Sequence, residues 1–139
     1  MNILFFLTPK ATCAYIRAED TIRQAMERME ACGYAALPIL RKDGSYCGTL
    51  TEGDLLWSIK NLGIHNVRDM ETHNIMEISH RKDNEPVKVD TNIEDLMSKA
   101  VEQNFVPVID DRSTFIGIIT RKAIMQYCMD HYIVKEAQK

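Results

Sequence analysis

One seven-residue segment that ends in a threonine, a short turn and an acid occurs twice in the chain, with one change. Gly48-Thr-Leu-Thr-Glu-Gly-Asp54 has a counterpart 69 positions later in Gly117-Ile-Ile-Thr-Arg-Lys-Ala123. A hydroxyl such as that of Thr51 can hydrogen-bond a phosphate or sugar oxygen, and an ionised carboxylate such as Asp54 can accept from both hydroxyls of a ribose diol. Ala123 cannot accept, so the two copies predict sites of different chemistry.

A structural reading of the same residues stands beside this one. Thr51 can be the N-cap of a helix. Asp54 in the first turn of that helix would then only interact favourably with the helix dipole. In the second copy, Thr120 is followed by Arg121 and Lys122, which favour phosphate over ribose. That basic pair can equally be a solvated pair at a helix start, where a cation opposes the dipole.

The segment belongs to a longer internal repeat, which predicts one module used twice. Pro38-Ile-Leu matches Pro107-Val-Ile at the same offset of 69. Upstream, four apolar residues with helical spacing match at an offset of 71: Ile22, Ala25, Met26 and Met29 correspond to Ile93, Leu96, Met97 and Ala100.

Each copy predicts the order strand, helix, strand, strand, helix. In the first copy the strands are 13–17, 36–40 and 47–51, with a turn at 42–45; the helices run from Asp20-Thr21 to Gly33 and over 54–60. In the second copy the strands are 87–90, 105–110 and 115–120, and the last helix is 122–129. The other helix starts at Thr91-Asn-Ile-Glu94, which has the form of a capping box.

These elements predict a mixed fold, α+β or α/β, of two tandem repeats. One such unit has an open apolar sheet face and too small a core to stand alone, so we expect the sheets to pack face to face with pseudo-two-fold symmetry, leaving a cleft at the strand ends. The predicted parts are residues 1–61 for the first repeat, 62–86 for a polar connector and the start of the second, 87–131 for the second repeat and 132–139 for a tail. A short helix is expected at 67–70 of the connector.

Composition narrows the class of protein. The 139 residues are 45% hydrophobic and 27% charged, as in a globular protein, and a net charge of -3 gives no basic surface for nucleic acid. No apolar run is long enough for a membrane helix and no signal peptide is seen, so we expect a cytoplasmic protein. The four cysteines have no CxxC spacing and are expected to be buried thiols: Cys13, Cys32, Cys47 and Cys128.

The doubled pattern of apolar-Pro-apolar strand, turn, Gly-h-h-Thr-x-x-Asp and helix resembles the cystathionine β-synthase (CBS) domain pair, or Bateman module. The opening residues 1–10 and the stretch 48–57 look like a group of small stand-alone bacterial proteins of this type. The resemblance covers about residues 8–60 and 67–130. It implies a regulatory module that binds an adenosine-containing molecule, with AMP, ADP or ATP expected first and cyclic di-AMP or S-adenosylmethionine as alternatives, in clefts between the repeats.

The resemblance also implies which residues bind. Asp54 would hold the ribose diol and Thr51 a ribose or phosphate oxygen. The adenine pocket would be lined by Tyr34, Ala36, Leu37 and Pro38, with backbone contacts from Thr12 and Cys13, and the matching positions of the second copy are Phe105, Val106, Pro107 and Thr120. Some members carry a basic residue before the strand proline, where this chain has Leu37 and Val106. Phosphate would then fall to Lys10, Arg81, Lys82, Arg121 or Lys122.

The family resemblance further implies a homodimer that forms through helices. A surplus of apolar residues on the predicted helices is compatible with such an interface, although burial in the core would also explain most of them: Leu55, Leu56, Ile59, Ile124, Met125 and Met129. The downstream protein partner is not indicated.

Two other classes of function compete with a nucleotide-binding module. No catalytic triad, carboxylate pair or metal-ligand spacing is present, so we expect no enzyme, no catalytic residue, no metal and no cofactor beyond the regulatory nucleotide. His65, His73 and His80 lie in the polar connector and read as surface residues. The second alternative is a ligand-free scaffold that docks a partner, and it predicts no thermal shift with any adenine nucleotide.

Overall fold

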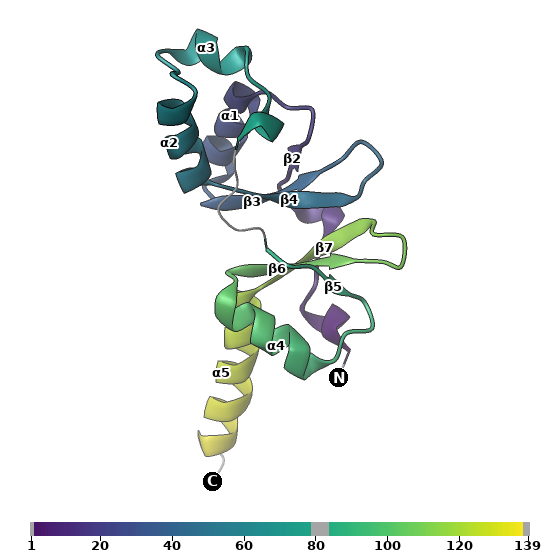
Figure 1. The fold of residues 1–139 in the computed structure, drawn as a ribbon. Helices are drawn as coiled ribbons and strands as arrows, with labels where there is room; N and C mark the ends of the chain where they lie inside the picture. The colour runs from purple at the N-terminus through teal and green to yellow at the C-terminus, as the bar shows by residue number, and fades with distance from the viewer. Residues whose placement is uncertain (1, 79–83, 138–139) are drawn as a thin grey trace. The chain divides into compact units, whose positions relative to one another are not determined.

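The chain folds into two compact units, one for each sequence repeat. The computed structural model describes residues 2–78 and 84–137, with side chains up to residue 132. The first-repeat unit comprises residues 14–83 and 113–115, and the second-repeat unit comprises residues 1–13, 84–112 and 116–139. Each unit holds one sheet with helices against it (Figure 1), so the predicted mixed fold of two tandem repeats is confirmed. The face-to-face packing of the sheets stays a prediction.

The first-repeat sheet has the order β2-β3-β4, with β2 (Ile16–Arg17) parallel and β4 (Tyr46–Thr51) antiparallel to β3 (Ala36–Leu40). Helix α1 (Ile22–Cys32) follows β2, and α2 (Glu52–Asn61) follows β4. These elements follow the predicted order. The strand expected at 13–17 is shorter and starts at Ile16. It is preceded by the 3₁₀ turn η2 (Lys10–Thr12), in which the Cys13 amide donates to the Lys10 carbonyl at 3.0 Å.

Helix α1 begins and ends at the residues that its sequence predicts. Thr21 is the N-cap and makes a full capping box with Gln24, so two amides of the first turn have partners. Gly33 ends the helix in the left-handed conformation at φ 74, where only glycine avoids a steric penalty. Between these ends, Ile22 and Met29 face the core of the unit.

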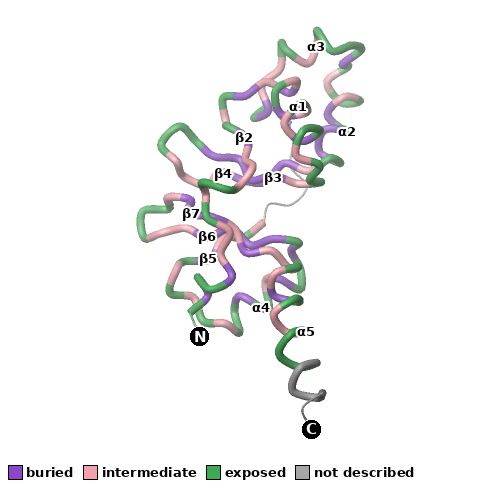
Figure 2. The backbone as a smooth tube through the Cα atoms, turned by 180° about the vertical axis from the view of Figure 1, so that it is seen from behind, coloured by how far each residue is buried: buried purple, intermediate pink, exposed green. Residues whose placement is uncertain are grey.

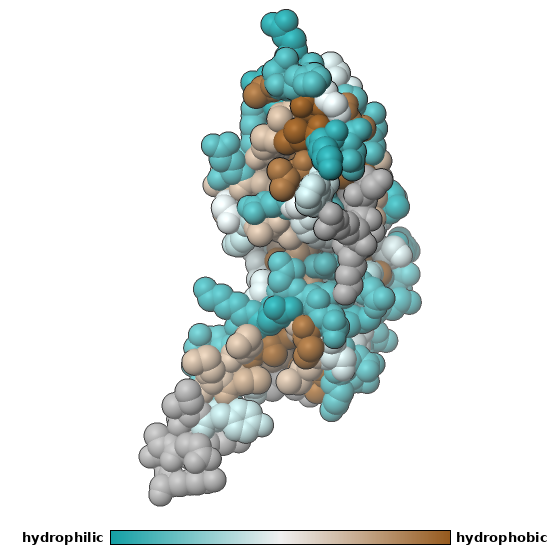
Figure 3. Space-filling model, turned by 60° about the vertical axis from the view of Figure 1, so that its left-hand side comes forward, coloured by the Kyte–Doolittle hydropathy of each residue, from teal (hydrophilic) through white to brown (hydrophobic). Residues whose placement is uncertain are grey.

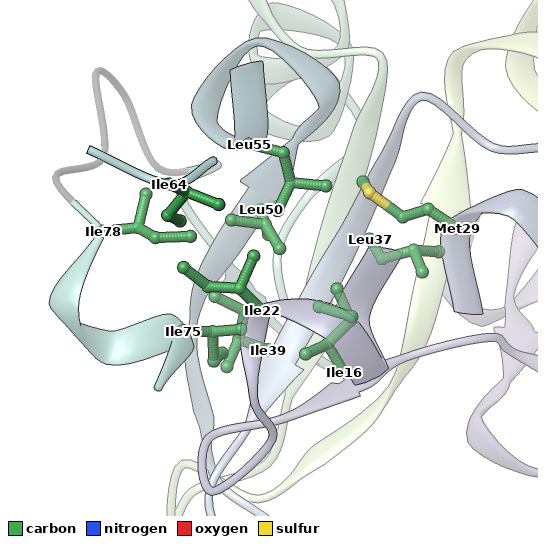
Figure 4. Close-up of a cluster of buried hydrophobic side chains, with 11 residues drawn as sticks. Ile16, Ile22, Met29, Leu37, Ile39, Leu50, Leu55, Ile64, Ile75 and Ile78 are labelled. Carbon is green, nitrogen blue, oxygen red and sulfur yellow. The ribbon is translucent and has the colours of Figure 1, made fainter. Parts of the chain in front are cut away.

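The connector adds more to the first-repeat core than its polar composition suggests. It contains α3 (Val67–Glu71), which confirms the predicted short helix, and the 3₁₀ turn η3 (Ile75–Glu77). Ile64, Ile75 and Ile78 are at most 7% exposed and pack into the same cluster as Leu50 (Figure 4). Residues 62–78 are therefore part of the first repeat's fold and do not merely join the repeats.

The second-repeat sheet has the order β1-β7-β6-β5, formed by β1 (Thr8–Pro9), β7 (Phe115–Thr120), β6 (Phe105–Ile109) and β5 (Val87–Lys88). Helix α4 (Ile93–Glu102) follows β5, and α5 (Arg121–Ala137) extends beyond the predicted end at 129. The capping box expected at Thr91 and Glu94 was wrong, because the N-cap lies one residue later and only its own side chain makes the capping bond. Asn92 is the N-cap, and its side chain accepts from the Asp95 amide at 2.8 Å.

The N-terminal segment completes the second repeat, although the prediction assigned residues 1–61 to the first. Strand β1 pairs antiparallel with β7, with Thr8 opposite Ile118 and Pro9 opposite Gly117. The 3₁₀ turn η1 (Ile3–Phe6) precedes it and places Ile3, which is fully buried, and Phe6 in one cluster with Leu96 and Val106. The chain therefore contributes a segment to the second-repeat unit before it forms the first-repeat unit.

Burial follows the same plan in both units. The strands β3, β4 and β6 contain runs of consecutive buried residues, whereas the loops and the outer helix faces are exposed (Figure 2). Among the described residues, no helix is both long and apolar enough to cross a membrane.

Candidate functional site

The threonine and the acid of the first repeat form a reciprocal cap at the start of α2. Thr51 ends β4, and its Oγ1 accepts from the Asp54 amide at 3.0 Å. In return, the Thr51 amide donates to Asp54 Oδ2 at 2.9 Å, and the Asp54 side chain is only 4% exposed. The structural reading of this motif as an N-cap is therefore correct. The carboxylate is held in one orientation by the main chain.

The strand register places the other predicted residues of the first repeat beside this cap. In the β3–β4 ladder, Ala36 lies opposite Thr51 and Pro38 opposite Thr49, so all four share one face of the sheet. The opposite face carries Ile39 and the helices. Tyr34 is 61% exposed and lies two residues before β3. The unit thus brings Tyr34, Ala36, Thr51 and Asp54 to one end of the sheet, and Pro38 lies further along the same face.

Two of the predicted pocket residues point elsewhere. Leu37 is 2% exposed and Val106 is fully buried, and each belongs to the hydrophobic core of its own unit. Figure 4 shows the Leu37 side chain within the cluster that also holds Met29 and Leu50. Because side chains alternate across a strand, the neighbours of a residue that faces the site must face the core. Any ligand contact of Leu37 would come from its main chain.

The second repeat keeps the backbone of the cap and loses its acid. Thr120 Oγ1 accepts from the Ala123 amide at 3.0 Å, as Thr51 does from Asp54. The backbone at the strand end also matches, since the Arg121 amide donates to the Asn104 carbonyl at 3.0 Å and the Glu52 amide to Ala35 at 2.9 Å. The helix start is the same, but no carboxylate returns the bond.

A second difference between the copies is the size of the residue at the start of the middle strand. Ala36 corresponds to Phe105 at the offset of 69. Phe105 is 5% exposed and lies outside the helix-covered core cluster of its unit. A large ring fills space where the first repeat has a single methyl group. The substitution is visible in the sequence, and comparing side-chain volumes across the repeat would have revealed it.

Arg121, predicted to bind phosphate, is used within the protein. Its Nε donates to the Ala100 carbonyl at 2.7 Å and its Nη2 to the Val101 carbonyl at 3.3 Å. These carbonyls lie in the last turn of α4, where a cation interacts favourably with the helix dipole and with unpaired carbonyls. The contact offsets the unfavourable position of Arg121 at the start of its own helix. Arg121 is therefore a helix-capping residue in this structure.

The remaining predicted residues are scattered. Lys10, Thr12 and Cys13 belong to the second-repeat unit, where the chain after Pro9 runs toward the start of β7 and away from Thr120. Thr12 Oγ1 donates to the Pro9 carbonyl at 3.1 Å. Lys122 is exposed at the start of α5, and Pro107 is buried in β6. Arg81 and Lys82, like His80, lie outside the described residues.

The Cys13 thiol makes hydrogen bonds within the second-repeat unit. Its Sγ donates to the Thr8 carbonyl at 3.3 Å. Burial raises the pKa of Cys13, and a hydrogen bond with the main chain of Ile118 offsets part of the rise. A raised pKa keeps the side chain protonated at neutral pH, which makes it a poor nucleophile. The described cysteines are half-buried and free.

Metal ligands do not gather within residues 2–78 and 84–132. No group of three or more histidine, cysteine, aspartate or glutamate side chains there could hold a metal ion. Of the connector histidines, His73 Nδ1 lies 3.4 Å from Glu77 Oε1.

A family model for the CBS domain matches the chain twice, over residues 9–61 and again over residues 68–130. The chain belongs to the CBS domain family. This CBS pair has no match among curated proteins. The matched ranges contain Thr51, Asp54 and Thr120, so both copies of the seven-residue segment lie inside a CBS domain.

Solved structures share the fold of this CBS pair. CbpB in complex with c-di-AMP is 24% identical at a TM-score of 0.84, with 98% of this chain and 91% of that chain covered. CbpB of Listeria monocytogenes, also in complex with c-di-AMP, is 22% identical at 0.79, with 91% and 93% covered. CBSX2 in complex with AMP is 19% identical at 0.74, with 94% and 98% covered.

The missing acid of the second CBS domain supplies a prediction about stability. Ala123→Asp should restore the reciprocal bond from the Thr120 amide and add a negative charge at a helix start. We expect the free energy of unfolding to rise by about 1 kcal/mol, measured by urea denaturation. As a control, Ala123→Asn tests the hydrogen bond without the charge. A loss of stability in both variants would show that the half-buried position cannot accept the longer side chain.

Proposed function

We propose that this CBS pair is a regulatory, non-enzymatic sensor that binds an adenosine-containing nucleotide at the strand end of its first repeat. AMP, ADP and ATP are the ligands that we place first. The observation that carries the proposal is the Thr51–Asp54 cap, which fixes a carboxylate beside the small Ala36 at the start of a helix.

The chemistry of this end suits a nucleoside phosphate. A carboxylate accepts up to about four hydrogen bonds, so Asp54 can serve the cap and a ribose hydroxyl together. The N-terminus of α2 favours an anion. At Gly53, an added Cβ would meet nothing closer than Thr51 Oγ1 at 3.7 Å, so the turn is open to close approach. The exposed ring of Tyr34 offers a stacking surface for a base.

A second candidate ligand is cyclic di-AMP. It is favoured by the two CbpB complexes, whose fold this chain shares over more than nine-tenths of its length. Both candidates contain adenosine, so both would place a sugar against Asp54. They differ in phosphate charge and in size, and a ligand panel separates them.

Regulation requires that the ligand bind two conformations with different affinity, because equal affinity shifts no equilibrium. We therefore propose that nucleotide binding changes the packing of the protein and that a protein partner reads the change. We propose that the module acts as a homodimer in the cytoplasm, where these nucleotides occur. A ligand-free scaffold is the competing function, and it predicts no response to any of the ligands.

The decisive test is a thermal-shift panel with AMP, ADP, ATP, cyclic di-AMP and S-adenosylmethionine. At a concentration of about 100 Kd, a bound ligand stabilises the folded protein by about 2.7 kcal/mol. We expect Asp54→Ala to lose most of the ligand-induced shift. Since this variant also loses a cap, each shift is compared with that of the same variant without ligand.

Two further variants distinguish the contribution of the helix cap to stability from the contribution of Asp54 to ligand binding. Asp54→Asn keeps an acceptor for the Thr51 amide but loses the charge, so its stability should change little while its ligand shift falls. Asp95→Ala removes the acid at the matching helix position of α4, whose amide is capped by Asn92, and should keep the full shift. Equal shifts in wild type and Asp54→Ala would remove Asp54 from the site. No shift with any ligand would favour the scaffold.

A further inference from the structure

The two repeats are alike over their helices and differ at the strand ends where their caps lie. In both units, apolar side chains reach the surface over the helices (Figure 3), and Met26 on α1 corresponds to Met97 on α4. At its strand end, the second repeat carries side-chain amides, Asn84 and Gln103, whose counterparts in the first repeat are not amides. This difference adds to the loss of the acid at Ala123.

The Gln103 side chain makes three hydrogen bonds with the main chain of its own unit. Gln103 lies two residues before β6 and is only 6% exposed. Its Oε1 accepts from the Glu85 amide at 3.0 Å, and its Nε2 donates to the Glu85 carbonyl at 3.1 Å. The same Nε2 donates to the Phe105 carbonyl at 3.3 Å. The amide therefore ties the segment before β5 to the start of β6.

Two further contacts hold this segment in place. Asn84 Nδ2 donates to the Phe105 carbonyl at 3.0 Å, and Lys99 Nζ on α4 donates to Glu85 Oε2 at 2.6 Å. Because β5 runs parallel to β6, the residues just before β5 lie beside the start of β6. The start of β6 is also where the cap of α5 lies, since the Asn104 carbonyl accepts from the first amide of that helix. The strand end of the second repeat is thus closed by side chains of the chain itself.

The first repeat holds the matching segment to its helix as well. At the offset of 71, Arg28 on α1 corresponds to Lys99 on α4. Arg28 Nη1 donates to the Tyr15 carbonyl at 2.6 Å. At the same offset, Ala14 corresponds to Glu85. The two segments are therefore equivalent, and a cation from the helix anchors each of them.

The first repeat has no counterpart of the Gln103 amide. Tyr34 lies two residues before β3, as Gln103 does before β6, and it is 61% exposed. A primary amide carries a donor beside an acceptor, whereas a phenol has a single hydroxyl. Tyr34 therefore cannot bind the amide and the carbonyl of Ala14 together. The strand end of the first repeat is left without this closure.

The edge of a primary amide resembles the edge of an adenine base. Adenine presents an amino donor beside a ring-nitrogen acceptor, and a glutamine amide presents the same pair of groups. A base that reached the second strand end would compete with Gln103 for the amide and carbonyl of Glu85. Displacing Gln103 would leave a buried amide without partners, which costs affinity. The Phe105 ring, where the first repeat has Ala36, also takes up space there.

We propose that the Gln103 amide takes the place of an adenine base at the strand end of the second repeat, so that each chain binds one nucleotide, at its first repeat. This inference rests on the proposed function and specifies how many sites are open. It assigns the closure to Gln103 and Phe105 and not to the missing acid alone. The competing account, in which Ala123 alone disables the second end, predicts that an acid at 123 restores binding.

Counting bound AMP tests the proposal, because AMP carries one adenosine. Equilibrium dialysis with radiolabelled AMP gives the number bound per chain at saturation. We expect the same number, one, for wild type and for Ala123→Asp, since Gln103 still closes the second end in that variant. An opened variant with Gln103→Tyr, Phe105→Ala and Ala123→Asp carries the residues of the first repeat at these positions. It should bind one AMP more per chain than wild type.

Two AMP molecules bound per chain of wild type, or a second site gained by Ala123→Asp alone, would overturn the proposal. An opened variant with the circular dichroism spectrum of wild type and no additional site would overturn it too. If wild type bound no AMP, the proposed function would fail for this nucleotide, whereas one site gained on opening would still support the closure. The two failures are therefore distinguishable.

Hydrogen exchange tests the closure without a nucleotide and with one substitution. Gln103→Leu removes all three hydrogen bonds of the side chain, so the Glu85 amide should exchange about tenfold faster than in wild type. Gln126→Leu is the matched control, because Gln126 Nε2 donates to Asp130 on the exposed side of α5. It should leave the exchange of Glu85 unchanged. Unchanged exchange of Glu85 in Gln103→Leu would overturn the proposal.

Discussion

Gly117→Ala should destabilise the protein by about 3 kcal/mol and detach β1 from its sheet. A Cβ at this position would lie 2.3 Å from the Thr8 carbonyl oxygen, 2.8 Å from Leu7 Cδ1 and 3.1 Å from Pro9 Cα. Two of these atoms are backbone and cannot move without moving β1. Overpacking of this kind costs about 1 to 3 kcal/mol, and the φ of +157 adds strain for a residue with a side chain. Urea denaturation measures the loss.

Gly53→Ala is the matched control. Gly53 lies in the first turn of α2, and an added Cβ would meet only Thr51 Oγ1 at 3.7 Å. Replacing a helical glycine by alanine should raise the free energy of unfolding by about 0.5 to 1 kcal/mol. Hydrogen exchange on Gly117→Ala should show faster exchange in β1. Wild-type stability for Gly117→Ala would mean that β1 does not pack on β7 as described.

Ile3→Ala should lower the free energy of unfolding by about 3 kcal/mol, although Ile3 lies in a short 3₁₀ turn. Ile3 is fully buried in the second-repeat core together with Leu96, Val106 and Ile119. Truncating a buried isoleucine to alanine costs about 2 to 5 kcal/mol, because apolar contacts are lost and a cavity remains. The measurement is the free energy of unfolding in urea.

Leu4→Ala provides the comparison, since Leu4 is in the same 3₁₀ turn and is 40% exposed. Its loss should stay below about 1 kcal/mol. If both variants lost equally little stability, the N-terminal turn would not belong to the second-repeat core. If both were equally severe, the turn itself, and not the burial of Ile3, would be responsible.

The regular elements could be predicted because local periodicity determines them. Ile22, Ala25 and Met29 recur at helical spacing and are buried in α1, and Gly33 ends the helix as its type indicates. At α4, two adjacent residues can both cap a helix. Asn92 and not Thr91 is the N-cap, so the predicted Thr91–Glu94 capping box does not form.

Long-range partners could not be read from the sequence. Strand β1 is two residues long and has no alternation to reveal it, and its partner in β7 is about 110 residues away. The same holds for Ile64, Ile75 and Ile78, which follow no common period and are buried by tertiary contacts alone.

The candidate site was predicted in part. The types and spacing of Thr51 and Asp54 predicted both a cap and an acceptor, and the cap is confirmed. The partner of Arg121 was not foreseen, because the carbonyls at the end of α4 come close only through the fold of the unit. The positive charge of Arg121 favoured a phosphate ligand, whereas its hydrogen bonds in the structure go to main-chain carbonyls of α4.

The position of β1 in the second-repeat sheet also has a consequence for synthesis on the ribosome. Thr8 and Pro9 leave the exit tunnel long before their partners Ile118 and Gly117. The first-repeat core can assemble while the N-terminal segment waits, and closing so long a loop slows the final step. A polypeptide released before residue 117 would keep Ile3 and Phe6 exposed, and exposed apolar segments of incomplete chains promote aggregation.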